Sequence, residues 1–144
     1  MMMKQVKIIF ENDDGTESLW ATPGEKGFVI DNYPLYLKGV CYGDVVKAEL
    51  IGADTYKYFE TIEKSGNSLY RVFYEKEKNQ NAGTLLQNAK ALGADFEVSE
   101  LEEGSLVAVH IPEDADADAI WAQIESGINS GVWDVEEGDD RHAS

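Results

Sequence analysis

The sequence is poor in the residues that build disulfides and metal centres, with one cysteine (Cys41) and two histidines among 144 residues. One cysteine permits no internal disulfide, so nothing in the chain requires an oxidising compartment. One cysteine and two histidines are also too few for an ordinary structural zinc site. We therefore expect no metal and no cofactor.

Long hydrophobic runs are absent as well. The apolar run Ile8–Phe10 near the N-terminus is far shorter than the core of a secretory signal, and no later stretch approaches a membrane span of about 20 residues. Hydrophobic residues still make up 43% of the chain, which is enough for a folded core. These features predict a cytoplasmic protein with no membrane partner.

Positive charge is scarce in the second half of the chain. The net charge is −16, and residues 79–144 hold 15 acidic and only two basic residues, a net of −13, against −3 for residues 1–78. A field of this sign repels nucleic acid and attracts cationic partners, so we expect no nucleic-acid partner. The same acidity can also serve solubility alone.

The first half is expected to consist of short strands. Alternating apolar and polar residues, separated by turn residues, predict strands at 5–11, 17–22, 27–30, 45–50, 55–64 and 69–75. Asn12 to Gly15 has the composition of a hairpin turn. The pattern predicts a small β-barrel-like half over residues 1–67, with the strand 69–75 shared by both halves.

The spacing of apolar residues changes to a helical period after Lys78. It predicts helices near 80–92 and 114–129, and strands at 94–98, 105–111 and 132–136. Strand, helix, strand, strand, helix, strand is the order of a ferredoxin-like βαββαβ sandwich. The predicted fold class is α+β, with an acidic ferredoxin-like half at 68–137 and a flexible tail at 138–144.

The stretch from Ile30 to Leu50 combines turn residues, glycines and aromatic side chains. An Asp-Asn-Tyr-Pro turn precedes two glycines that bracket a small apolar segment, which is the composition of a bent corner. An ordered barrel corner explains these residues most simply. A second interpretation is a ligand pocket lined by Tyr33, Tyr36 and Tyr42.

A family resemblance is carried by three runs, of which the second is the most specific. The runs are ESLWATP (17–23), IDNYPLYLKGVCYGDVVKAE (30–49) and EKSGNSLYRVFYE (63–75). They resemble the bacterial family DUF4265, a domain of unknown function, and the similarity covers about residues 4–136. The resemblance implies a bacterial domain but no activity, so no catalytic residue can be carried over.

Two patterns suggest chemistry and are better explained without it. Asp114, Asp116, Asp118 and Glu125 mimic the spacing of a calcium loop, but Ala119 occupies the position that needs glycine, and a strand precedes the loop. Acidic residues in a first helical turn explain them more simply. Cys41 and His110 lack any motif that would orient the imidazole or bind an oxyanion, so we expect no catalytic residues and no enzymatic activity.

The sequence thus favours a non-enzymatic acidic binding protein that docks on a cationic protein. One example is an immunity protein that neutralises a nuclease-type bacterial toxin. The candidate partner-binding residues are Glu102, Glu103, Glu113, Asp114, Asp116 and Asp118. The alternatives are a small-molecule-sensing domain that uses the tyrosine corner, and an enzyme of unrecognised type; the sequence does not predict the oligomeric state.

Overall fold

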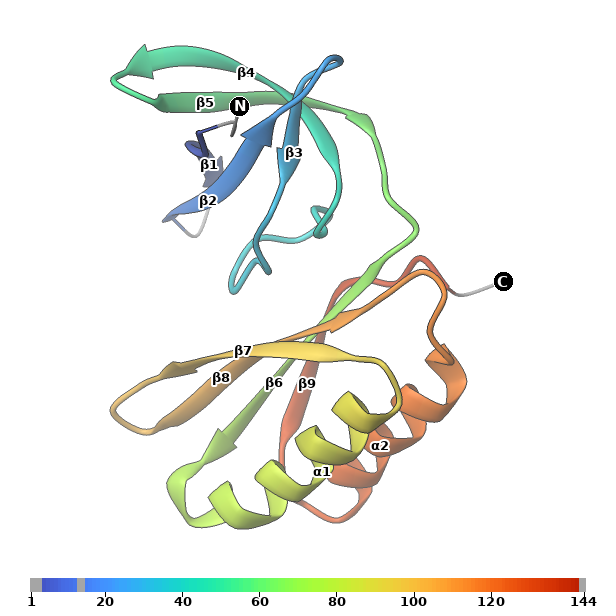
Figure 1. Cartoon of the computed structure of the whole chain (residues 1–144). Helices are drawn as coiled ribbons and strands as arrows, with labels where there is room; N and C mark the ends of the chain where they lie inside the picture. The colour runs from blue at the N-terminus through green and yellow to red at the C-terminus, as the bar shows by residue number, and fades with distance from the viewer. Residues whose placement is uncertain (1–3, 13–14, 143–144) are drawn as a thin grey trace. The chain divides into compact units, whose positions relative to one another are not determined.

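Five strands close into a barrel in the first of two units of the chain (Figure 1). A computed structural model describes residues 4–12 and 15–142, and the chain divides into the units Met1–Ser65 and Gly66–Ser144. The barrel strands are β1 (Val6–Asn12), β2 (Gly15–Pro23), β3 (Phe28–Ile30), β4 (Val45–Gly52) and β5 (Thr55–Glu63). Neighbouring strands pair in chain order, and a parallel pairing of β1 with β5 closes the barrel.

The period-two pattern of the sequence builds the interior of this barrel. Val6, Ile8 and Phe10 alternate along β1 and are buried, and Leu19 and Ala21 meet them from β2. Because side chains of a strand point to opposite faces in turn, the polar residues between them face outward. The expected barrel is confirmed. Asp13 and Asp14, which belong to the predicted hairpin turn, lie outside the described residues.

Two helices and a four-stranded sheet form the second unit. In chain order they are β6 (Ser68–Glu75), η1 (Lys76–Lys78), α1 (Asn79–Ala91), β7 (Asp95–Glu100), β8 (Gly104–Ile111), α2 (Ala117–Asn129) and β9 (Asp134–Asp139). The strands lie in the order β7-β8-β6-β9, all neighbours antiparallel. Mixed α+β structure, mostly strands with two helices, is confirmed.

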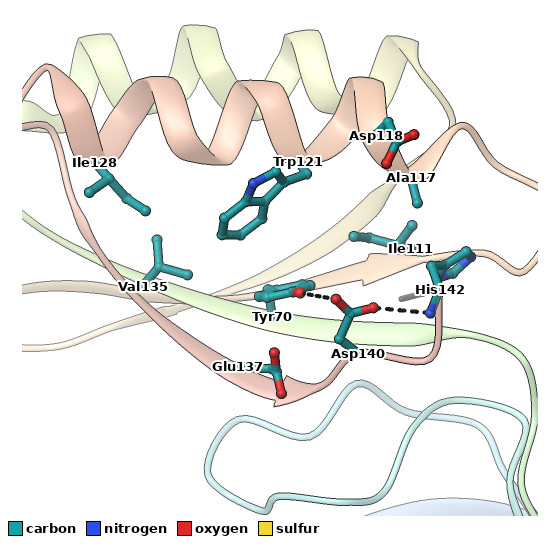
Figure 2. A pocket seen from close by; sticks show the side chains of 10 residues that line it. All are labelled: Tyr70, Ile111, Ala117, Asp118, Trp121, Ile128, Val135, Glu137, Asp140 and His142. Carbon is teal, nitrogen blue, oxygen red and sulfur yellow. Dashed lines mark hydrogen bonds between the residues drawn. The ribbon is translucent and has the colours of Figure 1, made fainter. Parts of the chain in front are cut away.

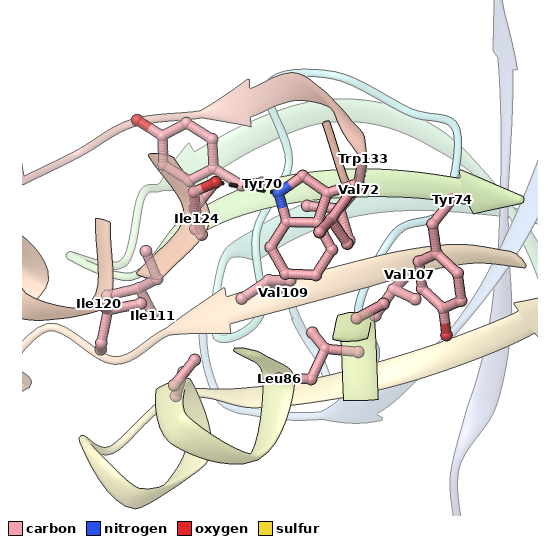
Figure 3. Packing of buried hydrophobic residues seen from close by; sticks show 14 residues of the cluster. Tyr70, Val72, Tyr74, Leu86, Val107, Val109, Ile111, Ile120, Ile124 and Trp133 are labelled. Carbon is pink, nitrogen blue, oxygen red and sulfur yellow. Dashed lines mark hydrogen bonds between the residues drawn. The ribbon is translucent and has the colours of Figure 1, made fainter. Parts of the chain in front are cut away.

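The core of the second unit lies between the sheet and the two helices (Figure 3). Tyr70, Val72 and Tyr74 alternate along β6 and point into it. The Trp133 indole N–H donates to the backbone oxygen of Ile124 at 2.9 Å, which satisfies its buried polar atom.

Three predictions from the sequence differ from the structure. The strand 69–75 is not shared: both edges of β6 are occupied by β8 and β9, and the barrel closes without it. Helix α2 begins at Ala117 rather than 114, because Asp116 is its N-cap and accepts the Ala119 N–H at 3.1 Å. Strand β9 extends through Gly138 and Asp139, which the sequence assigned to the tail.

Both helices are amphipathic, and each has 13 residues. Within the described ranges 4–12 and 15–142, no helix is long and apolar enough to cross a membrane.

Candidate functional site

The tyrosine corner is partly assembled in the structure. The rings of Tyr33 and Tyr42 meet edge to face with centroids 5.6 Å apart, whereas Tyr36 is 58% exposed. Burial raises the pKa of the Tyr42 hydroxyl, and the charge and hydrogen bond of Asp31 raise it further. Two of the three predicted tyrosines are therefore in contact, and both belong to the loop between β3 and β4.

Two carboxylates that the sequence did not single out hold this loop. Glu17 on β2 accepts the backbone N–H groups of Leu35 (2.6 Å), Tyr36 (3.1 Å) and Leu37 (2.8 Å). Asp44, which is fully buried, accepts the N–H groups of Cys41 at 3.0 Å and Ser65 at 2.9 Å. Charged acceptors bind N–H groups strongly, so the corner is an ordered structural feature.

Cys41 and His110 belong to different units. Cys41 is buried in the loop of the first unit. His110 lies on β8, where burial lowers its pKa while the charge of Asp95 acts in the opposite direction.

The six predicted carboxylates are all exposed but fall into two groups. The turn pair, Glu102 and Glu103, precedes β8, and the helix-start cluster follows it; this cluster comprises Glu113, Asp114, Asp116 and Asp118. The eight residues of β8 separate the groups by roughly 25 Å at the usual rise per residue of a strand. The structure therefore brings together four of the six.

The helix-start cluster adjoins a cleft of about 510 Å³, which we call the α2–β9 cleft (Figure 2). Side chains of α2 line one wall, and β6, β8, β9 and the residues after β9 line the other. The lining residues are Tyr70, Ile111, Ala117, Asp118, Trp121, Ile128, Val135, Glu137, Asp140 and His142. The volume falls in the range of small-molecule sites, about 300–1,000 Å³. Of its lining, sequence reasoning had proposed only Asp118.

Negative charge and aromatic rings dominate the polar chemistry of the cleft. The Tyr70 hydroxyl donates to Asp140 Oδ2 at 2.6 Å, and Asp140 Oδ1 accepts the backbone N–H of His142 at 3.0 Å. Burial raises the pKa of Tyr70, and Asp140 and then Glu137 raise it further. Tyr70 therefore remains a neutral hydrogen-bond donor at neutral pH. Its ring packs on that of Trp121, with centroids 5.2 Å apart.

Ser68 and His142 resemble a nucleophile and its base, but the geometry indicates that their contact has a structural role. Ser68 Oγ lies 2.6 Å from His142 Nδ1, and His142 Nε2 lies 2.9 Å from the carbonyl oxygen of Pro112. A carbonyl only accepts, so Nε2 carries a proton, and Ser68 Oγ also lies 3.5 Å from Asp140 Oδ1. Ser68 is 1% exposed and also accepts the Arg141 N–H at 2.7 Å. The hydroxyl is thus fully engaged in fixing the chain after β9.

Among residues 4–12 and 15–142, no group of three or more His, Cys, Asp or Glu side chains could hold an ion. Of the residues that mimic a calcium loop, Asp114, Asp116 and Asp118 lie at the start of α2, where Asp116 caps the helix, and Glu125 lies within the helix.

Comparison with known proteins gives a matching family model and a solved structure of similar fold. The family model described as "Domain of unknown function (DUF4265)" matches residues 17–135, which confirms the resemblance drawn from the sequence. A solved structure titled "Novel crystal structure of a hypothetical protein from Neisseria gonorrhoeae" aligns with a TM-score of 0.67 at 15% identity, covering 96% of this chain and 95% of that one. At this identity the likeness concerns the fold alone. No curated protein matches the sequence.

Proposed function

The chain belongs to the DUF4265 family, and from this starting point we propose that it is a non-enzymatic acidic protein that docks on a cationic protein. One observation carries the proposal: the helix-start cluster presents four exposed carboxylates, none of which forms an ion pair with a lysine or arginine of the described residues.

The surface of the barrel differs from the helix-start cluster in its ion pairs. Four of its exposed lysines sit beside carboxylates: Lys4 with Asp54, Lys26 with Glu63, Lys47 with Glu60 and Lys57 with Glu11. Exposed pairs of this kind stabilise little, but they leave a surface of mixed charge. The helix-start cluster retains a local negative potential, which speeds encounter with a cationic partner.

The partner class follows from this complementarity. A nuclease-type toxin binds phosphates and therefore carries a basic active site, which an acidic surface can cover while excluding the substrate. An immunity protein for such a toxin remains the specific form of the proposal. The cytoplasmic location that goes with it remains a prediction from the sequence.

We also infer that residues 68–137 form a ferredoxin-like half. Two features support it: the element order β6-α1-β7-β8-α2-β9, and the sheet order β7-β8-β6-β9, which places the first and third strands in the middle. In this arrangement, both helices cover one face of the sheet (Figure 1).

The test is an association-rate measurement with a basic nuclease domain, sought first among the products of the adjacent genes. Glu113→Lys/Asp114→Lys reverses two charges of the helix-start cluster and spares the Asp116 cap. We expect association to slow about tenfold at low salt and much less at high salt, because screening acts on the encounter. Glu102→Lys/Glu103→Lys is the matched control and should slow it less.

The docking proposal fails if the nuclease domain does not bind, or if neither double variant changes its association rate. Equal slowing by both variants would show a response to net charge rather than to a docking surface.

A further inference from the structure

We propose that the α2–β9 cleft is a binding site for an organic cation, an ammonium or guanidinium group carried on an alkyl arm. This inference goes beyond the docking function, because the cleft needs no partner surface to bind such a group. Three properties of its lining support the proposal: the negative charge, the aromatic rings, and the difference between its two ends.

The charge of the lining is of one sign. Its ten residues contain three carboxylates, Asp118, Glu137 and Asp140, and no lysine or arginine. Within the described ranges of the chain, no ion pair or hydrogen bond involves the side chains of Asp118 or Glu137. The imidazole of His142 is held between Ser68 and Pro112. The lining therefore favours a cation and opposes an anionic ligand.

The aromatic rings add a second attraction for the same charge. Tyr70 and Trp121 pack at 5.2 Å between centroids with their planes tilted by 42°, and both line the cleft. A cation over the face of an aromatic ring, most of all tryptophan, is stabilised by the ring quadrupole. Carboxylates beside aromatic rings thus select positive charge in preference to a neutral polar group.

The two ends of the cleft differ: Asp118 lies near one end, beside Ala117 and Ile111, whereas the other end is formed by apolar side chains. Figure 2 shows Asp118 near one end of the row beneath α2, Trp121 in its middle above Tyr70, and Ile128 with Val135 at the other end. This order follows from the antiparallel course of α2 and the chain from β9 onward. A ligand with a charged head and an alkyl arm of a few carbons fits this arrangement, with the arm against Ile128 and Val135.

Two sources share this chemistry: a small free amine or guanidine, and a lysine or arginine side chain of a bound protein. The experiment separates them with two probes. The first is butylguanidinium, with butylurea as its uncharged isostere. The second is the peptide acetyl-Ala-Arg-Ala-amide, with citrulline in place of arginine as its uncharged isostere.

Binding is followed by nuclear magnetic resonance of the full chain at low salt, on the indole N–H signal of Trp121 assigned by its loss in Trp121→Phe. We expect saturable shifts with butylguanidinium and weaker or no shifts with butylurea. Asp118→Asn/Glu137→Gln should weaken binding by about tenfold or more, since each carboxylate gives a charge-assisted contact. Glu102→Gln/Glu103→Gln removes the same charge away from the cleft and should leave the affinity within about twofold.

Binding of both charged probes supports a side-chain ligand, and binding of butylguanidinium alone supports a small free cation. The proposal is overturned if butylurea binds as well as butylguanidinium, if neither charged probe binds, or if the two double variants weaken binding equally. A negative result in the nuclease experiment leaves this outcome unaffected, since the two assays use different ligands.

Discussion

Single carboxylates organise the loop between β3 and β4, residues 31–44, which contains no helix or strand. Asp44 lies at its end and Glu17 lies on β2, and together they bind five backbone N–H groups. Glu17 is 18 to 20 residues away from the groups it binds, so no local sequence pattern predicts this contact.

Asp44→Asn tests this role. The amide keeps the shape of the carboxylate but turns an N–H₂ group toward one of two N–H donors, so one buried donor loses its acceptor. We expect the free energy of unfolding to fall by about 1–3 kcal/mol, measured by urea denaturation. Glu25→Gln, at an exposed position on the barrel, should change it by less than about 0.5 kcal/mol. An unchanged midpoint for Asp44→Asn would show that water replaces the lost contact.

The place of Tyr70 and Trp121 in the α2–β9 cleft could not be predicted from the sequence. Trp121 recurs with Ile120 and Ile124 at helical spacing, and Tyr70 alternates with Val72 along a strand, so these patterns alone predict core positions for all five. Ile120, Ile124 and Val72 are indeed at most 2% exposed. Residues of the same apolar pattern form both the core and the walls of the cleft. Only the packing of α2 against β6 and β9 determines which of them line the cleft.

At the scale of elements, local periodicity predicted both helices and most strands. Helix α1 was expected at 80–92 and spans Asn79–Ala91, because Ala82, Leu86 and Ala89 repeat at its period and Gly93 follows. Pairings distant in sequence were not predictable in this way. The parallel contact of β1 with β5 joins residues nearly 50 positions apart, and it excludes β6 from the barrel.

Two glycines within elements predict opposite responses to the same substitution. In Gly104→Ala, the new Cβ would overlap the backbone of Tyr74 and Glu75 across the β6–β8 pair, where nothing can rotate away. We expect a loss of about 1–3 kcal/mol in the free energy of unfolding. In Gly83→Ala, within α1, the Cβ meets nothing within 4 Å and should stabilise the protein by about 0.5–1 kcal/mol.

Thermal and urea denaturation of both variants provide the measurement. A Gly104→Ala protein as stable as the original chain would contradict the close approach of β8 to β6. A destabilised Gly83→Ala protein would contradict the space described beside α1.

At the scale of the whole molecule, charge is distributed unevenly between the units. Four lysine–carboxylate pairs lie on the barrel, whereas residues 79–144 carry a net charge of −13. Self-repulsion of this kind destabilises the folded state and is screened by salt.

Raising the sodium chloride concentration from about 20 to 300 mM should therefore raise the melting temperature by about 2–4 °C, equivalent to about 1 kcal/mol. Glu102→Gln/Glu103→Gln should raise the low-salt melting temperature and reduce this response, because both side chains lie without an ionic partner within the described residues. Glu11→Gln/Glu60→Gln removes two paired carboxylates and should not raise it. A melting temperature independent of salt in the original chain would exclude repulsion as a significant factor.

The central place of β6 in its sheet has a consequence for synthesis on the ribosome. All strands of the barrel have been made once β5 ends at Glu63, so the first unit can fold while the rest of the chain is still being translated. Strand β6 follows at once, but its two neighbours begin only at Gly104 and Asp134. During that interval, both edges of the apolar segment Leu69–Tyr74 are open to other nascent chains. Translation of the last strand, β9, thus ends the period in which this protein is most exposed to aggregation.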